Sequence, residues 1–244
     1  MYQNFKYLIN YFILKMSYRY GYNRYNDPDY YWKADENKIK RDFMNYANKS
    51  RKIEEEGYKK MGKTLGIDIY TDVFMTYFLF KCGATTIEYI TESEYMTGLK
   101  ALRCNTLNDV KNKMTKIKES WLTLENNDDF RNFYLFLFSF NVQAKGAALK
   151  TKSLPYEIVE VYFKGLFFQF KIINEFLQFL KSKNVGLKWD EWNTFLDFLK
   201  DKGATFPKDY EYGTAYYPSI CDEFYIWYCK KHNIKIPDEE EEEF

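Results

Sequence analysis

The fold is decided by two stretches of the sequence, Ile90-Thr91-Glu92-Ser93-Glu94-Tyr95 and Leu187-Lys188-Trp189-Asp190-Glu191-Trp192. Each begins with an apolar residue suited to a short extended piece and continues into an acidic helix start. In the first stretch Thr91 and Glu94 have the spacing of a capping box, with an apolar residue on either side placed as a hydrophobic staple. Both stretches therefore predict a short strand that leads directly into a helix.

Apolar residues recur at helical spacing on both sides of these stretches. The clearest stripe steps by three and four along the chain through Leu107, Val110, Met114, Ile117 and Trp121. The same spacing recurs within residues 130–140, within 192–199, and within 158–166, a segment that Ser153 and Pro155 open. Residues 70–82 are apolar nearly all round, so we expect their helix to be deeply buried or to line a groove.

Helix, short strand and helix, present twice, is the layout of paired EF-hands. A calcium loop needs oxygen ligands at alternate positions around a glycine and ends in a glutamate. Neither Gly83–Glu94 nor Lys183–Asn193 supplies that series, so calcium binding is not expected. The sequence predicts an all-α, mainly helical protein in which two EF-hand-like helix–short strand–helix units pack into one helical domain without calcium loops.

The composition of the 244-residue chain fits one domain with short extensions. Hydrophobic residues make up 46% of the chain, with 22 Phe and 24 Tyr, which is enough for a substantial core. The 36 basic and 35 acidic residues leave a net charge of +1, without the basic excess of a general nucleic-acid binder. We therefore expect no nucleic-acid partner.

The four cysteines and the single histidine argue against disulfide, metal and thiol chemistry. The chain has no CxxC motif, and only Cys229 and His232 lie at ligand spacing, which does not close a zinc site. A Cys–His nucleophile pair is disfavoured because this histidine lies next to the C-terminal tail. Gly-rich phosphate loops, zincin motifs and nucleophile elbows are also absent from the sequence. We predict reduced structural thiols, no metal site, no cofactor and no catalytic residue.

Three parts follow one another along the chain. Residues 1–37 read as an N-terminal extension, an apolar segment followed by a Tyr- and Asn-rich linker. Residues 38–232 carry the helical pattern, and residues 233–244 form an acidic tail with five consecutive glutamates. No stretch reaches the ~18–20 apolar residues of a membrane span, and no signal-peptide cleavage site follows the first segment. We expect a soluble protein of the cytoplasm or nucleus, without a membrane partner.

Two further features point to partner binding. Residues 133–140 form an aromatic run too apolar to have a solvent face, and it predicts either a central core helix or one end of an apolar slot. Near the C-terminus, residues 190–198, Tyr210 and residues 215–224 set acidic side chains beside aromatic ones. That combination indicates either a solvated, capped helix face or a docking patch for a basic partner.

These residues resemble a known family. The segment 190–198, the Tyr-Pro-x-x-x-Asp-Glu-Phe run at 217–224 and the helix at 130–140 are similar to the potentiating-neddylation (PONY) domain of the defective-in-cullin-neddylation proteins. The resemblance covers residues 38–230 in matching order, and it includes residues 65–68 and 94–98.

The resemblance implies a helical fold with paired EF-hand-like units and a non-catalytic ligase-type scaffold function. Members of the family promote neddylation by binding the C-terminal winged-helix region of a cullin and the N-terminally acetylated conjugating enzyme. The cullin RING subunit is a further candidate partner. The alternative is a degenerate EF-hand-type adaptor that binds an amphipathic helix of another partner.

The resemblance also implies two sets of site residues. The cullin-binding residues are Asp190, Ala215, Tyr216, Asp222 and Glu223, where either Ala215 or Tyr216 takes the place of the family's patch alanine. The residues of the conjugating-enzyme pocket are Met75, Phe78, Leu79, Cys82, Ile90, Phe140 and Tyr162. Residues 143–152 look inserted relative to the family pattern, and Gly165 stands where a larger apolar side chain is expected.

Overall fold

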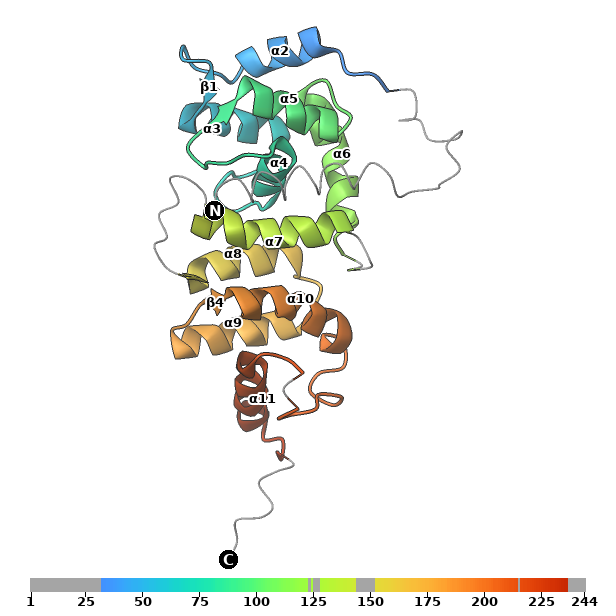
Figure 1. Cartoon of the computed structure of the whole chain (residues 1–244). Coiled ribbons are helices and arrows are strands. Elements are labelled where there is room, and N and C mark those ends of the chain that lie inside the picture. The colour runs from blue at the N-terminus through green and yellow to red at the C-terminus, as the bar shows by residue number, and fades with distance from the viewer. Residues whose placement is uncertain (1–31, 123, 125–127, 144–151, 215, 237–244) are drawn as a thin grey trace, which may run out of the picture. The chain divides into compact units, whose positions relative to one another are not determined.

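The computed structural model of the chain describes residues 32–122, 124, 128–143, 152–214 and 216–236 (Figure 1). These residues are mostly helical, with two short antiparallel strand pairs, so the predicted fold class is confirmed. The chain separates into two compact units. The first unit contains residues up to 65, 78–84 and 89–112, and the second contains residues 66–77, 85–88 and 113 onward.

The first unit holds two helix–strand–helix elements. One consists of α2 (Glu36–Met44), β1 (Lys52–Ile53) and α3 (Glu55–Leu65). The other consists of the end of α4 (Phe74–Cys82), β2 (Ile90–Thr91) and α5 (Glu92–Ala101). The strands pair antiparallel, with Lys52 opposite Thr91 and Ile53 opposite Ile90. The strand predicted at Ile90 is therefore present, and β1 is its partner.

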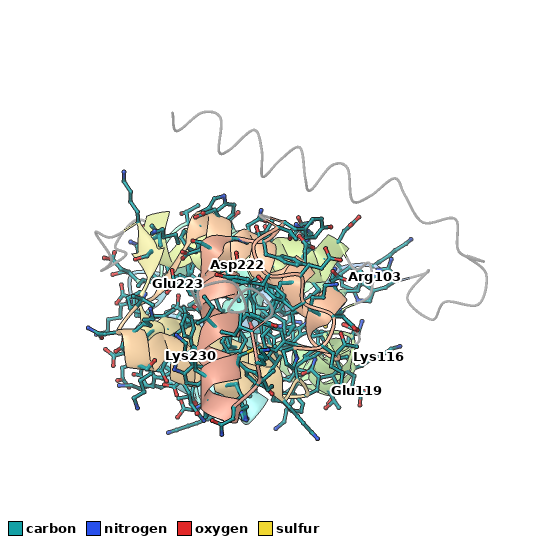
Figure 2. All side chains as sticks on the ribbon, turned by 90° about the horizontal axis from the view of Figure 1, so that it is seen from below. Arg103, Lys116, Glu119, Asp222, Glu223 and Lys230 are labelled. Carbon is teal, nitrogen blue, oxygen red and sulfur yellow. The ribbon has the colours of Figure 1, made fainter. Side chains whose placement is uncertain are left out.

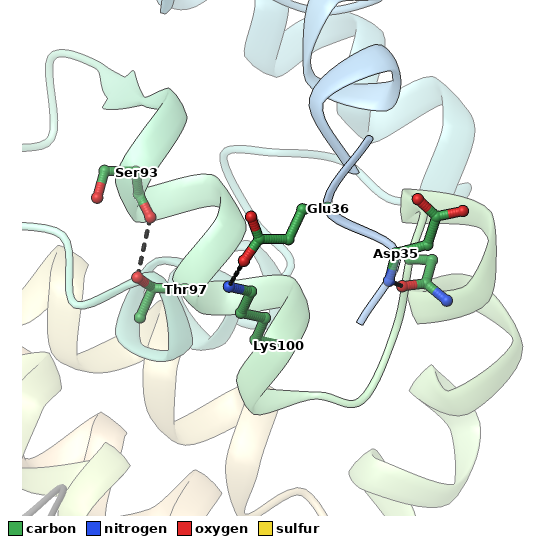
Figure 3. Close-up of polar contacts among 6 residues, drawn as sticks. Asp35, Glu36, Ser93, Thr97 and Lys100 are labelled. Atoms are coloured by element: carbon green, nitrogen blue, oxygen red, sulfur yellow. Dashed lines mark hydrogen bonds and ion pairs between the residues drawn. The ribbon is translucent and has the colours of Figure 1, made fainter. Parts of the chain in front are cut away.

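Side-chain caps explain where the helices of the first unit begin. Thr91 and Glu94 form the predicted capping box, in which the Glu94 carboxylate accepts from the Thr91 N–H at 2.8 Å. The Asp35 carboxylate accepts from the Lys38 N–H at the start of α2. Figure 3 shows two contacts that hold this start in place, the Asp35 N–H to the Asn105 amide oxygen and the Lys100 ammonium to the Glu36 carboxylate.

A buried carboxylate links three segments in the core of the first unit. Asp42 in α2 is 8% exposed and accepts from the Tyr95 hydroxyl at 2.5 Å and from the Leu107 N–H at 2.8 Å. The Tyr95 ring packs against Phe43 and Phe78 at centroid distances of 5.6 and 5.7 Å. Buried polar groups are stable only when they are hydrogen-bonded, and both of these contacts meet that need.

The second unit repeats the same arrangement. It contains α7 (Asp128–Gln143), β3 (Ser153–Leu154) and α8 (Tyr156–Leu166), followed by α9 (Ile172–Lys183), β4 (Leu187–Lys188) and α10 (Trp189–Lys202). The strands pair antiparallel, with Ser153 opposite Lys188 and Leu154 opposite Leu187. The stripe at residues 107–121 forms α6 (Leu107–Glu119), and α11 (Ser219–His232) packs against α9 (Figure 1).

The aromatic run forms the core of the second unit, as the first of its two interpretations predicted. Phe133, Tyr134, Leu137 and Phe138 are at most 2% exposed. Tyr134 and Trp192 stack at 4.4 Å and exchange two hydrogen bonds, the Tyr134 hydroxyl to the Trp192 carbonyl and the Trp192 indole N–H to the Tyr134 carbonyl. This reciprocal pair fixes α10, and with it the acidic helix start, against α7.

Three segments named from the sequence differ from the structure or lie outside it. Ser153 belongs to β3, and α8 begins at Tyr156 after Pro155, because the strand pairing with β4 takes up the residues expected to start the helix. Residues 1–31 of the N-terminal extension and 237–244 of the acidic tail lie outside the described residues. So does most of the segment that looks inserted, residues 144–151.

Candidate functional site

Asp190 occupies the first turn of α10 and its side chain is exposed. The helix starts there because β4 ends at Lys188, whose N–H donates to the Glu191 carboxylate at 2.7 Å. Acidic residues at this position complement the positive end of the helix dipole. The carboxylate of Asp190 is thus presented to solvent from a helix end whose position is fixed by the core.

Asp222 lies in the first turn of α11, which follows Pro218, and Glu223 is the next residue of the helix. Figure 2 shows both residues near one end of this helix, with Lys230 near the other end. Asp222 accepts a hydrogen bond from the Tyr210 hydroxyl at 2.6 Å and a longer one from the Gly213 N–H at 3.4 Å. Glu223 is exposed and its carboxylate lies 3.2 Å from the Lys183 ammonium. The Asp222 carboxylate is therefore held in one orientation.

Tyr216 is the most exposed of the large hydrophobic side chains in the described part of the chain, at 74%. Its ring meets that of Tyr217 edge-on at 4.8 Å. Ala215 lies outside the described residues, so the choice between Ala215 and Tyr216 for the patch alanine stays open. The structure places Asp190, Tyr216, Asp222 and Glu223 in the same unit, the second.

The sequence places Tyr210 and Tyr217 among the aromatic residues of this surface, but it does not predict their contacts or the carboxylate of Asp201. The Tyr217 hydroxyl donates to the Asp201 carboxylate at 2.6 Å, and this hydrogen bond lowers the pKa of Asp201. Burial, followed by the hydrogen bond to Asp222, raises the pKa of Tyr210, so its hydroxyl stays a donor at neutral pH. These contacts link residues 12 and 16 positions apart through a loop without periodicity, so no sequence signal announces them.

The predicted pocket residues are all buried, and they divide between the two units. In the first unit lie Phe78, Leu79, Cys82 and Ile90. In the second unit lie Met75, Phe140 and Tyr162. Each set belongs to the apolar core of its own unit.

The second unit contains a cavity of about 90 Å³ between α8 and the segment that leads into α4. It is lined by Ile69, Tyr70, Asp72, Val73, Thr76, Ile158, Val161 and Tyr162. Among the predicted pocket residues, Tyr162 alone lines it. The Tyr162 hydroxyl accepts from the Asn141 amide at 2.7 Å and also hydrogen-bonds to Thr76. The lining thus combines apolar side chains with polar groups, in a cavity smaller than the usual ligand pocket.

Gly165 contributes to the size of this cavity. A Cβ atom built on Gly165 would lie 3.2 Å from Val73 Cγ1, and Val73 lines the cavity wall. A larger apolar side chain, which the resemblance leads one to expect at this position, would project toward that wall. The glycine therefore leaves room next to Val73.

The described residues offer little for metal or thiol chemistry. Across residues 32–236, apart from the undescribed positions, no group of three or more His, Cys, Asp or Glu side chains could hold a metal ion. The four cysteines are free and buried, as the sequence predicted. Burial raises the pKa of the Cys221 thiol to about 12, and also raises that of Cys82. Among the same residues, no helix has the length and apolar character that crossing a bilayer requires.

Comparison with known proteins gives consistent matches. A family model described as "Cullin binding" matches residues 109–227, a range that contains Asp190, Tyr216, Asp222 and Glu223. Human DCN1-like protein 4 is 23% identical over 189 residues, which cover 78% of this chain and 62% of that protein. Bovine DCN1-like protein 5 is 23% identical over 186 residues, which cover 76% of this chain and 75% of that protein. The order of motifs, the helical fold and these matches agree, and together they support the defective-in-cullin-neddylation family.

Proposed function

We propose that the chain is a non-catalytic scaffold that promotes neddylation of a cullin. In this proposal one surface binds the C-terminal winged-helix region of the cullin, and a separate pocket binds the N-terminally acetylated conjugating enzyme. The observation that carries the proposal is the pair of carboxylates, Asp190 and Asp222, which lie in the first turns of two helices inside the range that matches the cullin-binding family.

The electrostatic character of this surface favours a basic partner. Asp190 and Asp222 lie in first turns, and Glu223, which follows Asp222, forms an ion pair with Lys183. The net charge of the whole chain is only +1, so the negative potential here is local. Complementary charge of this kind steers association and selects partners more than it adds raw affinity.

Charge reversal tests the cullin surface. Full-length chain carrying both Asp190→Lys and Asp222→Lys should bind the cullin winged-helix domain at least about a hundredfold more weakly, because like charges would then face each other. Calorimetric titration measures the affinity, and circular dichroism checks the fold. Unchanged affinity in the folded variant would remove this surface from the proposal.

Asp222→Asn provides the matched control. The asparagine keeps an acceptor for the Tyr210 hydroxyl and removes only the charge. It should leave the loop held and weaken cullin binding by about tenfold. If Asp222→Asn bound the cullin domain as tightly as the unsubstituted chain, the role of Asp222 would be orientation of the loop, and the charge argument would fail.

The cavity beside Tyr162 supports the second half of the proposal. Acetylation removes the ammonium charge of a protein N-terminus, whose burial would be prohibitive, and leaves an amide that can be satisfied by hydrogen bonds. The cavity offers an apolar wall together with the hydroxyls of Thr76 and Tyr162. The resemblance also assigns Met75, Phe78, Leu79, Cys82, Ile90 and Phe140 to the conjugating-enzyme site, and none of these six lines the cavity.

Paired peptides test the pocket. A peptide of the conjugating enzyme's N-terminus should bind at least about tenfold more tightly when acetylated than with a free amine. Gly165→Leu should weaken binding of the acetylated peptide, because the leucine side chain would project toward the cavity wall at Val73. Equal affinity of the two peptides would favour the adaptor that recognises an amphipathic helix without regard to acetylation.

The state of the cysteines supports a non-catalytic role. A thiol must form a thiolate to act as an acceptor or nucleophile, and burial of Cys82 and Cys221 disfavours that form. In this proposal the conjugating enzyme supplies the chemistry. The chain accelerates transfer by holding the two proteins close together, which raises their effective concentration.

A further inference from the structure

Trp189 is an exposed tryptophan next to the proposed cullin-binding residue Asp190. It is the first residue of α10, and 45% of its side chain is exposed. The indole meets the buried ring of Phe138 edge-on at 5.2 Å. Phe138 thus supports one side of the indole and restricts its motion, while another side faces solvent.

The turn before β4 adds a second exposed apolar side chain, Val185, at 39%. This turn is held at both ends. A Cβ on Gly186 would lie 1.8 Å from the Leu154 carbonyl oxygen, so the backbone there packs directly against β3. Lys183 connects the other end to α11 through its 3.2 Å ion pair with Glu223. Val185 and Trp189 therefore lie in one rigid segment that also carries or contacts the acidic residues.

Rigid, partly exposed apolar side chains rimmed by charge have the anatomy of a protein-binding surface. Interfaces place apolar residues at their centre and polar residues at the rim, and tryptophan is enriched among the side chains that contribute most to affinity. An indole face also attracts Arg and Lys side chains by cation–π interaction. A tryptophan beside carboxylates is thus suited to a partner surface in which basic and aliphatic side chains alternate.

We infer that Trp189, with Val185 beside it, is the apolar anchor of the cullin-binding surface and determines which cullin is bound. This inference rests on the proposed function. The occupant is the basic surface of the cullin, because Asp190 is the next residue in the same helical turn and its charge is complementary to that partner. Trp189 also lies within the range that matches the cullin-binding family.

Single substitutions in the full-length chain test the anchor. Trp189→Ala should weaken binding to the winged-helix domain of the cognate cullin by at least about tenfold, and Trp189→Phe should restore part of the loss. Phe168→Ala is the matched control, because Phe168 is 67% exposed in the same unit but lies outside the acidic surface, and it should bind like the unsubstituted chain. When Trp189→Ala is titrated against two cullins of the same organism, the loss of affinity should be larger for the cullin that the unsubstituted chain binds more tightly.

The outcomes separate this inference from the proposed function. If the cullin affinity of Trp189→Ala is within about twofold of that of the unsubstituted chain while Asp190→Lys abolishes binding, Trp189 is not the anchor. The proposed cullin-binding surface is then still supported. If neither variant changes binding, the proposed cullin surface itself is wrong. Radical footprinting of the unsubstituted complex gives a test that is independent of folding. Trp189 should be protected by the cullin while Phe168 is not, and an unprotected Trp189 would overturn the inference.

Discussion

Cys221 shows how burial at a single residue controls chemistry and stability. Its side chain is 1% exposed, and burial raises its pKa to about 12, with the neighbouring Asp222 adding to the shift. In the unfolded chain a cysteine has a pKa of about 8.5. Between these values the unfolded state has released its proton and the folded state has not. Rising pH therefore favours unfolding over this range.

The contribution of Cys221 to the free energy of unfolding should consequently be constant up to about pH 8 and should fall between about pH 8.5 and 12. Urea denaturation at a series of pH values measures this. A Cys221→Ala variant should show a shallower fall over the same range. An identical slope in the two proteins would mean that Cys221 titrates alike in the folded and unfolded states.

Prediction from sequence at the residue scale was successful where a residue's neighbours in the chain determine its surroundings. Asp190 was expected at a helix start, and it lies in the first turn of α10. The hydrogen bond from the Tyr210 hydroxyl to Asp222 depends on the path of the loop between them, which the local sequence does not predict. The roles of the predicted cullin and conjugating-enzyme residues remain predictions, since a role depends on a partner.

Of the helices, α5 is the one whose first residue the sequence predicts most directly. Thr91 Oγ1 accepts a hydrogen bond from the Glu94 N–H at 3.3 Å, and the Glu94 carboxylate accepts one from the Thr91 N–H. Thr91→Ala should therefore lower the free energy of unfolding by about 1 kcal/mol, the usual cost of removing an N-cap. Thermal and urea denaturation of the full-length chain measure the change.

Thr97→Ala is the control for that substitution. Thr97 lies in the same helix and is exposed. Its hydroxyl donates a hydrogen bond to the Ser93 carbonyl of the preceding turn (Figure 3). Its replacement should change stability by less than about 0.5 kcal/mol. A loss at Thr91 no larger than the loss at Thr97 would show that the capping box adds nothing to stability.

The two strands that sequence reasoning missed explain a limit at the element scale. Ile90 and Leu187 were expected to be extended because each precedes an acidic helix start. Their partners, Lys52–Ile53 and Ser153–Leu154, are two residues long and thus have no alternation to detect. A strand of this length is defined by the strand it pairs with. The sequence therefore predicted one half of each strand pair.

At the scale of the whole molecule, the same helix–strand–helix arrangement occurs in pairs in both units. Residues 90–95 and 187–192, which resemble each other in sequence, each supply one strand of a pair. In each unit the partner strand comes from an earlier helix–strand–helix element. No calcium loop is needed, because the strand pairs and aromatic cores join the helices. This leaves helix starts such as those of α10 and α11 available for binding.

The rate of cullin neddylation measures the central claim most directly. With conjugating enzyme, modifier and cullin held constant, adding the full-length chain should accelerate transfer to the cullin, and the Asp190→Lys, Asp222→Lys variant should not. The acceleration should also disappear when the conjugating enzyme lacks its N-terminal acetyl group. Transfer that is equally fast without the chain, or equally accelerated by the charge-reversed variant, would contradict the account.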